Sequence, residues 1–213
     1  MEIIRGKHAS FIDCAQLTKM IAGRENIHID IGTGDGRFVR HIAGENPARF
    51  VIGIDACREN LHDISRRAPS NALFVIANAQ ALPPELCGLA SSISVNFPWG
   101  SLLESLLTDD ADLMAGLHMI ARPHASLEVR LNAGALAECG WTFEAGVDQV
   151  RQVLTGNGFN LRPSLRLTSS DLRACPTTWA KRLAYGRDPR AMLLRGTMPI
   201  TETLYGLTSF IPS

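Results

Sequence analysis

The sequence contains no apolar run that approaches the roughly 20 residues needed for a helix to cross a bilayer, so no membrane-spanning segment is predicted. Its first residues, MEIIRGKHASFIDC, include neither the basic segment nor the long apolar stretch of a signal peptide. Internal repeats and low-complexity tracts are also absent, and the composition, with 46% hydrophobic and 20% charged residues, is typical of a globular protein. We therefore expect a cytoplasmic protein without membrane contact.

Cysteine is scarce and does not form a recognisable ligand set. The 5 cysteines include no C-x-x-C pair, and the histidines are scattered along the chain. Neither a disulfide framework nor a zinc site is indicated. We expect no bound metal and reduced, partly buried thiols. The residues concerned are Cys14, Cys57, Cys87, Cys139 and Cys175.

The formal net charge is zero, because 21 Lys and Arg balance 21 Asp and Glu. The average conceals an asymmetry: residues 1–150 carry 12 Lys and Arg against 18 Asp and Glu, whereas residues 151–213 carry 9 against 3. A polyanion would meet the C-terminal third of the chain rather than its whole surface. On charge alone, a solvated basic face fits the pattern equally well.

The chain does contain a regular alternation of strand-like and helix-like segments. Strands are predicted at 26–32, 50–57, 72–79, 92–98, 126–133 and 190–200, and helices at 15–23, 37–47, 58–68, 106–123, 146–159 and 179–187. This alternation favours a doubly wound α/β sheet, mostly parallel, with ligands at the carboxyl ends of its strands. We predict one domain over 1–213, with an N-terminal hairpin at 1–11 and substrate-recognition insertions within 132–180.

The strongest local signal is the stretch DIGTGDG, Asp30 to Gly36, which follows an apolar strand and opens a helix. Its glycines let the backbone turn tightly and approach a ligand closely. Asp55 ends the next strand, where a carboxylate can accept both hydroxyls of a ribose. An acid two positions before the first glycine suits a ligand with an ammonium group, such as S-adenosylmethionine, and is unfavourable beside a pyrophosphate.

This motif resembles that of the class I S-adenosylmethionine-dependent methyltransferases, which implies their Rossmann-like fold and their cofactor. In that class, Ala79 and Gln80 would line the adenine of the cofactor, and Asn96 would lie where the methyl group meets the substrate. The expected cofactor-binding residues are Asp30, Gly32, Thr33, Gly34, Gly36, Asp55, Ala56, Ala79, Gln80 and Asn96.

Two tryptophans suggest what the substrate is. Trp99 follows the fourth predicted strand directly after Pro98, which cannot donate to a sheet ladder, so Trp99 is predicted to point out of the sheet. Trp179 begins a basic helix, and aromatic rings among cations are typical of nucleic-acid surfaces. Two such rings could enclose a base turned out of its helix. A core position is the alternative for Trp99, and Trp141 is expected to be packed.

Six motifs occur here in the order of one family: RGK, DIGTGDGR, GIDA, ANAQALPPEL, PWGSLL and TTWAKRL. The chain resembles the aminoglycoside-resistance methyltransferases that act at N1 of the decoding-site adenine of 16S ribosomal RNA. The resemblance implies that Trp99 and Trp179 are the catalytic residues, stacking on either side of the flipped adenine, and that a monomer meets the small ribosomal subunit. The RNA contacts it implies are Lys7, Arg66, Arg67, Thr177, Lys181, Arg182, Arg187 and Arg195.

No general base is predicted, because N1 of neutral adenine already carries a lone pair and catalysis can come from holding that nitrogen in line with the methyl group. Other functions remain open. VNFPW is also similar to a motif of transfer RNA guanine-N7 methyltransferases. In an amino-group methyltransferase, the Asn96 side chain would accept a hydrogen bond from the exocyclic amine. A small-molecule methyltransferase and a non-enzymatic, cofactor-binding ribosome assembly factor are further alternatives.

Overall fold

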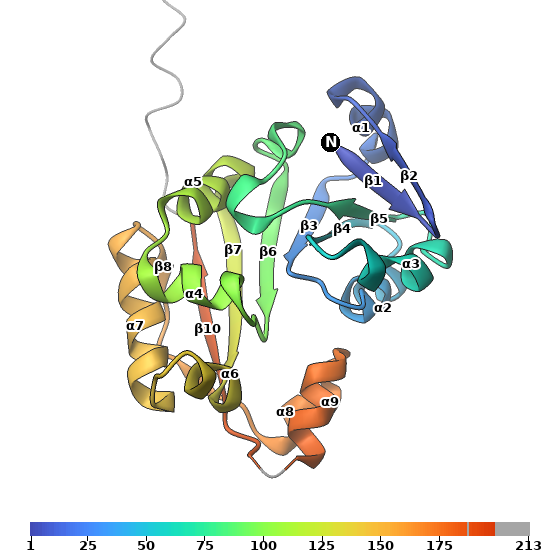
Figure 1. The fold of residues 1–213 in the computed structure, drawn as a ribbon. Helices are drawn as coiled ribbons and strands as arrows, with labels where there is room; N and C mark the ends of the chain where they lie inside the picture. The colour runs from blue at the N-terminus through green and yellow to red at the C-terminus, as the bar shows by residue number, and fades with distance from the viewer. Residues whose placement is uncertain (187, 199–213) are drawn as a thin grey trace, which may run out of the picture.

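The computed structural model describes residues 1–186 and 188–198. It is built on a 10-stranded sheet with the order β2-β1-β5-β4-β3-β6-β7-β10-β8, and β9 also pairs with β10 (Figure 1). The strands are β1 (Glu2–Arg5), β2 (His8–Phe11), β3 (Asn26–Ile31), β4 (Arg49–Asp55), β5 (Ala72–Ile76), β6 (Ala90–Asn96), β7 (Ala121–Asn132), β8 (Asn160–Leu161), β9 (Leu165–Arg166) and β10 (Ala191–Thr197).

The five strands β5, β4, β3, β6 and β7 pair in parallel, whereas β10 and the β1–β2 hairpin pair antiparallel at the two sides. The prediction of a mostly parallel α/β sheet is therefore confirmed, and so is the hairpin, with Gly6 in its turn. Strand order reverses between β3 and β6, and ligands of such sheets bind in the crevice at this reversal. The carboxyl ends of these two strands are Ile31 and Asn96.

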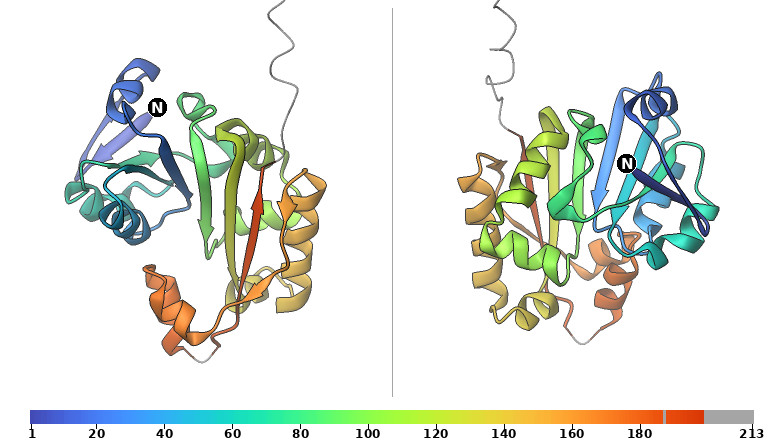
Figure 2. Two further views of the ribbon diagram at one scale, coloured as in Figure 1. Left: turned by 180° about the vertical axis from the view of Figure 1, so that it is seen from behind. Right: turned by 45° about the horizontal axis from the view of Figure 1, so that its top comes forward.

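Helices cover both faces of the sheet (Figures 1 and 2). The helices are α1 (Cys14–Ile21), α2 (Arg37–Glu45), α3 (Arg58–Arg66), α4 (Ser101–Thr108), α5 (Ala111–Ile120), α6 (Ala133–Glu138), α7 (Phe143–Gly156), α8 (Ser169–Ala174) and α9 (Thr178–Tyr185), with short 3-10 turns at Ala79–Ala81 and Pro84–Leu86. No helix in the described residues is long and apolar enough to cross a membrane.

Successive side chains of β3 point to opposite faces of the sheet, and each face is covered by a layer of helices. Ile27, Ile29 and Ile31 are fully buried in the larger core, which also includes apolar side chains of α1, α4, α5, α6 and α7. The opposite face is covered by α2 and α3, whose Val39 and Leu61 belong to a second buried cluster. The polar residues His28 and Asp30 interrupt β3 on this second face, and both are buried.

Several predicted boundaries need correction. The single helix expected at 106–123 is two helices, because Asp109 adopts a left-handed conformation (φ 58°) and the Asp110 side chain caps α5 at Leu113 N. The third predicted strand ends at Ile76, since Asn78 accepts from Gln80 N and begins a 3-10 turn. Of the cysteines, Cys139 and Cys175 are partly buried, but the other three are exposed. Trp141 packs against the larger core, as expected.

The predicted insertion 132–180 divides into two parts. Helices α6 and α7 pack on the core of the sheet, whereas α8 and α9 lie apart, beyond the carboxyl ends of β3 and β6 (Figure 1). A small apolar cluster of Phe97, Leu172, Ala180 and Ala191 joins α8 and α9 to the end of β6. The unit α8–α9 thereby faces the reversal point of the sheet.

Candidate functional site

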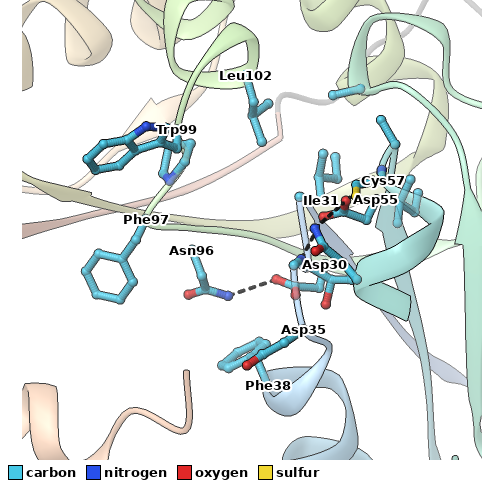
Figure 3. Close-up of a pocket in the computed structure, with 18 of the residues that line it drawn as sticks. Asp30, Ile31, Asp35, Phe38, Asp55, Cys57, Asn96, Phe97, Trp99 and Leu102 are labelled. Carbon is cyan, nitrogen blue, oxygen red and sulfur yellow. Dashed lines mark hydrogen bonds between the residues drawn. The ribbon is translucent and has the colours of Figure 1, made fainter. Parts of the chain in front are cut away.

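A cavity of about 540 Å³ opens at the reversal point of the sheet, within the usual size range of small-molecule sites. Its walls come from the ends of β3, β4 and β6 and from the glycine loop after β3 (Figure 3). The first turn of α9 completes the wall. Eight of the ten predicted cofactor residues line it: Asp30, Gly32, Thr33, Gly34, Asp55, Ala56, Ala79 and Asn96. The order of strands thus brings together residues that lie far apart in the sequence.

Asp30 is the most buried charged group of the cavity wall, at 1% exposure. Its Oδ1 accepts hydrogen bonds from Ser94 Oγ (2.5 Å) and from Asn96 Nδ2 (2.8 Å). Asn96 is fixed at its other end, because Arg130 Nη1 donates to Asn96 Oδ1 at 2.7 Å. Because Ser94 and Asn96 both donate to Oδ1, Oδ2 of Asp30 keeps acceptor positions for a ligand in the cavity.

Burial raises the pKa of Asp30 to about 6, and the Ser94 hydroxyl, the nearby Thr33 hydroxyl, the Asn96 amide and the charge of Arg130 only partly oppose this shift. Neighbouring His28 cannot supply a compensating charge. Its two ring nitrogens lie 2.8 Å from Ser92 Oγ and Ser94 Oγ, and burial lowers its pKa to about 3. Asp30 is therefore a carboxylate that gains from a cationic ligand, as the ammonium group of S-adenosylmethionine would provide.

Asp55 fixes the glycine loop across the cavity. Its Oδ2 accepts from Gly34 N–H (2.7 Å), while Oδ1 accepts from Cys57 N–H (2.9 Å) and Asn60 Nδ2 (3.3 Å). A carboxylate has about four acceptor positions, so one remains for a ligand hydroxyl. The buried Thr33 Oγ1 also lines the cavity and has no hydrogen-bond partner in the described protein. The polar groups present therefore fit a cofactor that carries an ammonium group and a ribose.

Gly34 has a left-handed φ of 55°, and a Cβ added there would meet no atom within 4 Å. Gly34→Ala is expected to cost about 1–2 kcal/mol of folding free energy because of this φ, and to weaken S-adenosylmethionine binding at least tenfold because its methyl group enters the cavity. Gly23→Ala is the matched control, since Gly23 has φ 73°, equally open surroundings and no place in the cavity wall. Calorimetric titration and thermal unfolding of both variants would measure this; equal cofactor affinities would contradict a role for Gly34 in the site.

Trp99 and Trp179 meet at the mouth of the cavity. Their rings stack on each other, with centroids 5.0 Å apart and planes 12° from parallel, and the two residues remain 39% and 37% exposed. Arg182 lies over the Trp179 ring, with its guanidinium carbon 5.1 Å from the centroid. The two tryptophans are therefore brought together, as predicted, but a base between them would require planes roughly 7 Å apart. The indoles must separate by about one ring thickness to admit one.

Phe97 explains how the chain presents Trp99. It has φ 52°, which a non-glycine residue rarely adopts, and its side chain is buried with Leu172 and Ala180 beneath the α8–α9 unit. Phe97 N–H donates to Arg130 O (2.8 Å), which ends the pairing of β6 with β7. The next residues therefore leave the sheet, and Trp99 lies at the cavity mouth while Asn96 stays beside Asp30.

Comparison with known proteins decides the family. The model of the family described as NpmA, 16S rRNA (adenine(1408)-N(1))-methyltransferase, matches residues 2–198. A 16S rRNA (adenine(1408)-N(1))-methyltransferase of Escherichia coli is 33% identical over 205 residues, which cover 88% of this chain and 94% of that protein. The chain belongs to this family.

Solved structures agree with this assignment. The aminoglycoside resistance methyltransferase NpmB1 superimposes with a TM-score of 0.77 at 32% identity, covering 92% of this chain and 98% of that chain. The 16S rRNA methyltransferase KamB superimposes with a TM-score of 0.84 at 27% identity, covering 93% of this chain and 100% of that chain. The Rossmann-like methyltransferase fold predicted from the glycine motif is thereby confirmed.

Two cofactor residues expected in this methyltransferase lie outside the cavity wall. Gln80 turns away, because its Nε2 donates to Ser105 Oγ (2.7 Å) in α4. Gly36 caps α2 with φ 65°. A Cβ there would lie 2.5 Å from the Phe74 ring, so a glycine is needed at this position for the packing of Phe74. Wall residues that were not among the expected site residues include Asp35, Phe38, Cys57, Asn60, Leu102 and Thr178, although Asp35, Leu102 and Thr178 lie within the quoted motifs.

The basic residues expected to contact RNA fall into separate groups. Gly6 N–H donates to Ser65 Oγ (2.9 Å), which places the hairpin turn with exposed Lys7 beside the exposed end of α3, where Arg66 and Arg67 lie. Thr177 caps α9 by accepting from Ala180 N (2.9 Å), and Lys181 and Arg182 follow it on that helix. Arg187 lies outside the described residues.

Arg195 differs from the other predicted RNA contacts. It lies on β10 opposite Glu128 of β7, and its Nε donates to Glu128 Oε1 at 2.9 Å. Glu128 also accepts from Arg130 Nη2 (2.6 Å), so the carboxylate bridges two guanidinium groups. The charge of Arg195 is thus partly neutralised within the protein, and a phosphate would compete with Glu128 for it.

Proposed function

We propose that this protein transfers a methyl group from S-adenosylmethionine to N1 of the adenine at position 1408 of 16S ribosomal RNA and thereby confers aminoglycoside resistance. The observation that carries the proposal is the Trp99–Trp179 pair at the mouth of a cavity whose inner end is Asp30. A base held between two indoles is oriented on both faces, and stacking is worth about 1–3 kcal/mol per base.

The cofactor would be held by Asp30 at its ammonium group and by Asp55 at its ribose, and when bound it supplies an electrophilic methyl group. The protein's own part is orientation. Trp99 and Trp179 set the plane of the base, and Asn96 closes the inner end of the cavity beside Asp30. No histidine or lysine lines the cavity among the described residues, which suits a nitrogen that needs no base to remove a proton.

The same geometry argues against methylation of an exocyclic amine through Asn96. That mechanism needs the Asn96 carbonyl oxygen as an acceptor for the amine. Here Oδ1 already accepts from Arg130 Nη1 and Nδ2 donates to Asp30, so the orientation of the amide is fixed and Oδ1 keeps one lone pair rather than two for an amine. N1 methylation is the reaction that these contacts support.

We also propose that the substrate is the assembled small subunit in the cytoplasm, met by a monomer. The exposed cations lie on separate elements, at the β1–β2 turn, the end of α3 and the first turns of α9. Groups distributed in this way match phosphates that only folded RNA brings together, rather than one continuous strand.

The test is tritium transfer from labelled S-adenosylmethionine to purified small subunits, with the modified base mapped as a reverse-transcription stop. A stop at adenine 1408 is the expected result, together with raised aminoglycoside tolerance in cells that express the chain. Label in transfer RNA instead would support the guanine-N7 alternative. Bound cofactor without methyl transfer to subunits or transfer RNA would support the assembly-factor alternative.

A further inference from the structure

Among the residues that the structure describes, one side-chain hydrogen bond joins the cofactor loop to the helix that carries Trp179. Thr178 Oγ1 donates to Asp35 Oδ2 at 2.5 Å, across 143 residues of sequence. Asp35 lies between Gly34 and Gly36 in the glycine loop, and both partners line the cavity. Asp35 lies on the cofactor side of the cavity and Thr178 lies beside Trp179 on the base side, so the bond connects the two sides.

The position of this bond on α9 is informative. Thr178 is the first residue of the helix, directly after the cap Thr177 and directly before Trp179. The Asp35 carboxylate therefore also lies at the positive end of the helix dipole, which strengthens its hold on α9. The Thr177 side chain is engaged within the helix, with Ala180 N, so it does not duplicate the link to the loop.

Little else fixes the first turn of α9 to the body of the protein. The apolar cluster beneath it contains Phe97, Leu172, Ala180 and Ala191, of which Phe97 directly follows β6, Ala191 begins β10, and the other two belong to α8 and α9 themselves. The Trp99–Trp179 stack is a further contact of this turn, and a base must open it. During base entry, the Asp35–Thr178 bond is thus the polar connection that can keep Trp179 in position.

We propose that Asp35 is a positioning residue, which holds Trp179 through Thr178 and makes binding of the target base depend on the state of the cofactor loop. The inference rests on the proposed function. Gly34 N–H bonds to Asp55 on the ribose side of the cavity, so a cofactor that orders Asp55 and Gly34 also orders the next residue, Asp35. Cofactor and small subunit should therefore strengthen each other's binding by the same factor.

The test compares subunit affinity with and without S-adenosylhomocysteine. For the wild type we expect affinity to rise about tenfold with the ligand, as one charge-assisted hydrogen bond can supply. Thr178→Val removes only the hydroxyl, and should reduce this ratio to about one and raise KM for subunits, with affinity for S-adenosylhomocysteine unchanged. Thr178→Ser keeps the hydroxyl and should restore the ratio. Thr18→Val is the matched control, since the exposed Thr18 Oγ1 donates only within α1, to Cys14 O (2.7 Å).

A double-variant cycle guards against a folding artefact. Asp35→Ala should reduce the ratio as Thr178→Val does, and the double variant should be no worse than either single variant. A wild-type ratio of one, a wild-type ratio retained by Thr178→Val, or equal behaviour of the Val and Ser variants would each overturn the inference while methylation of adenine 1408 stands. A wild type that does not methylate the subunit would instead contradict the proposed function itself.

Discussion

Trp99→Ala and Trp179→Ala are each expected to lower methylation of small subunits by one to two orders of magnitude, while S-adenosylmethionine binds nearly as before. Each substitution removes one of the two rings between which the base is proposed to stack, and stacking contributes about 1–3 kcal/mol per base. Because both residues are more than a third exposed, the loss of folding stability should be small. Initial rates, cofactor titration and thermal unfolding of the two variants would measure the three quantities.

Trp141 provides the control for the tryptophan variants. It is partly buried against the larger core and does not line the cavity, so Trp141→Phe should keep full activity. Trp99→Phe and Trp179→Phe should retain part of the activity, since a smaller ring still stacks. If Trp99→Ala unfolds the protein or loses cofactor binding, Trp99 has a packing role and the base platform must lie elsewhere.

Asp30→Asn is expected to abolish detectable S-adenosylmethionine binding, because it removes the one carboxylate that is buried within residues 1–186 and 188–198 and can face the ammonium group. The wild type should show the corresponding pH dependence. With the pKa of Asp30 at about 6 in the cofactor-free protein, affinity should be constant above about pH 7 and fall about tenfold per pH unit below pH 6, as the carboxylate takes up a proton. Calorimetric titration between pH 5 and pH 8 would measure the profile.

The same substitution should stabilise the cofactor-free protein at neutral pH. Folding raises the pKa of Asp30 from its ordinary 3.8 to about 6, so this group's stabilising contribution is complete below about pH 4 and is lost as the pH rises through 6. An asparagine avoids the buried charge, and its Oδ1 can still accept from Ser94 and Asn96. We expect a higher Tm for Asp30→Asn than for the wild type at pH 7.5. The exposed control Asp63→Asn should have the same Tm as the wild type. A lower Tm would show that the carboxylate is needed for folding rather than for the ligand.

Which strand-end residues line the cavity could largely be predicted from the sequence. Apolar runs define β3 and β4, and a residue that directly ends such a run must lie at the carboxyl edge of the sheet, which places Asp30 and Asp55. Gln80 was placed by the same logic and lies elsewhere, because a 3-10 turn begins at Ala79 and directs the Gln80 side chain to Ser105. Strand ends are predictable, whereas the turn that follows one depends on local side-chain hydrogen bonds.

For the substrate half of the site, the sequence predicts which residue types are present but not how they pair. The tryptophans and cations were recognised by type, but pairings across the fold decide what each can do. Arg195 meets Glu128 because β10 runs antiparallel to β7 in one particular register, and Thr178 meets Asp35 across most of the chain. Neither pairing has a local signal. The helix expected at 106–123 is wrong for a local reason, because the polar pair Asp109 and Asp110 separates two apolar runs: Asp109 ends α4 with a left-handed φ, and the Asp110 side chain caps α5.

The course of the chain around α8 and α9 has a consequence for how such proteins diversify. Leu165 and Arg166 of β9 pair with Leu193 and Met192 of β10, so the chain departs from the sheet and re-enters it at adjacent positions. The excursion between them carries Trp179, Lys181 and Arg182 but contributes no strand to the parallel core. Selection can therefore lengthen, shorten or exchange this excursion at little cost in loop closure. New RNA targets can arise in this way while the inherited cofactor chemistry is preserved.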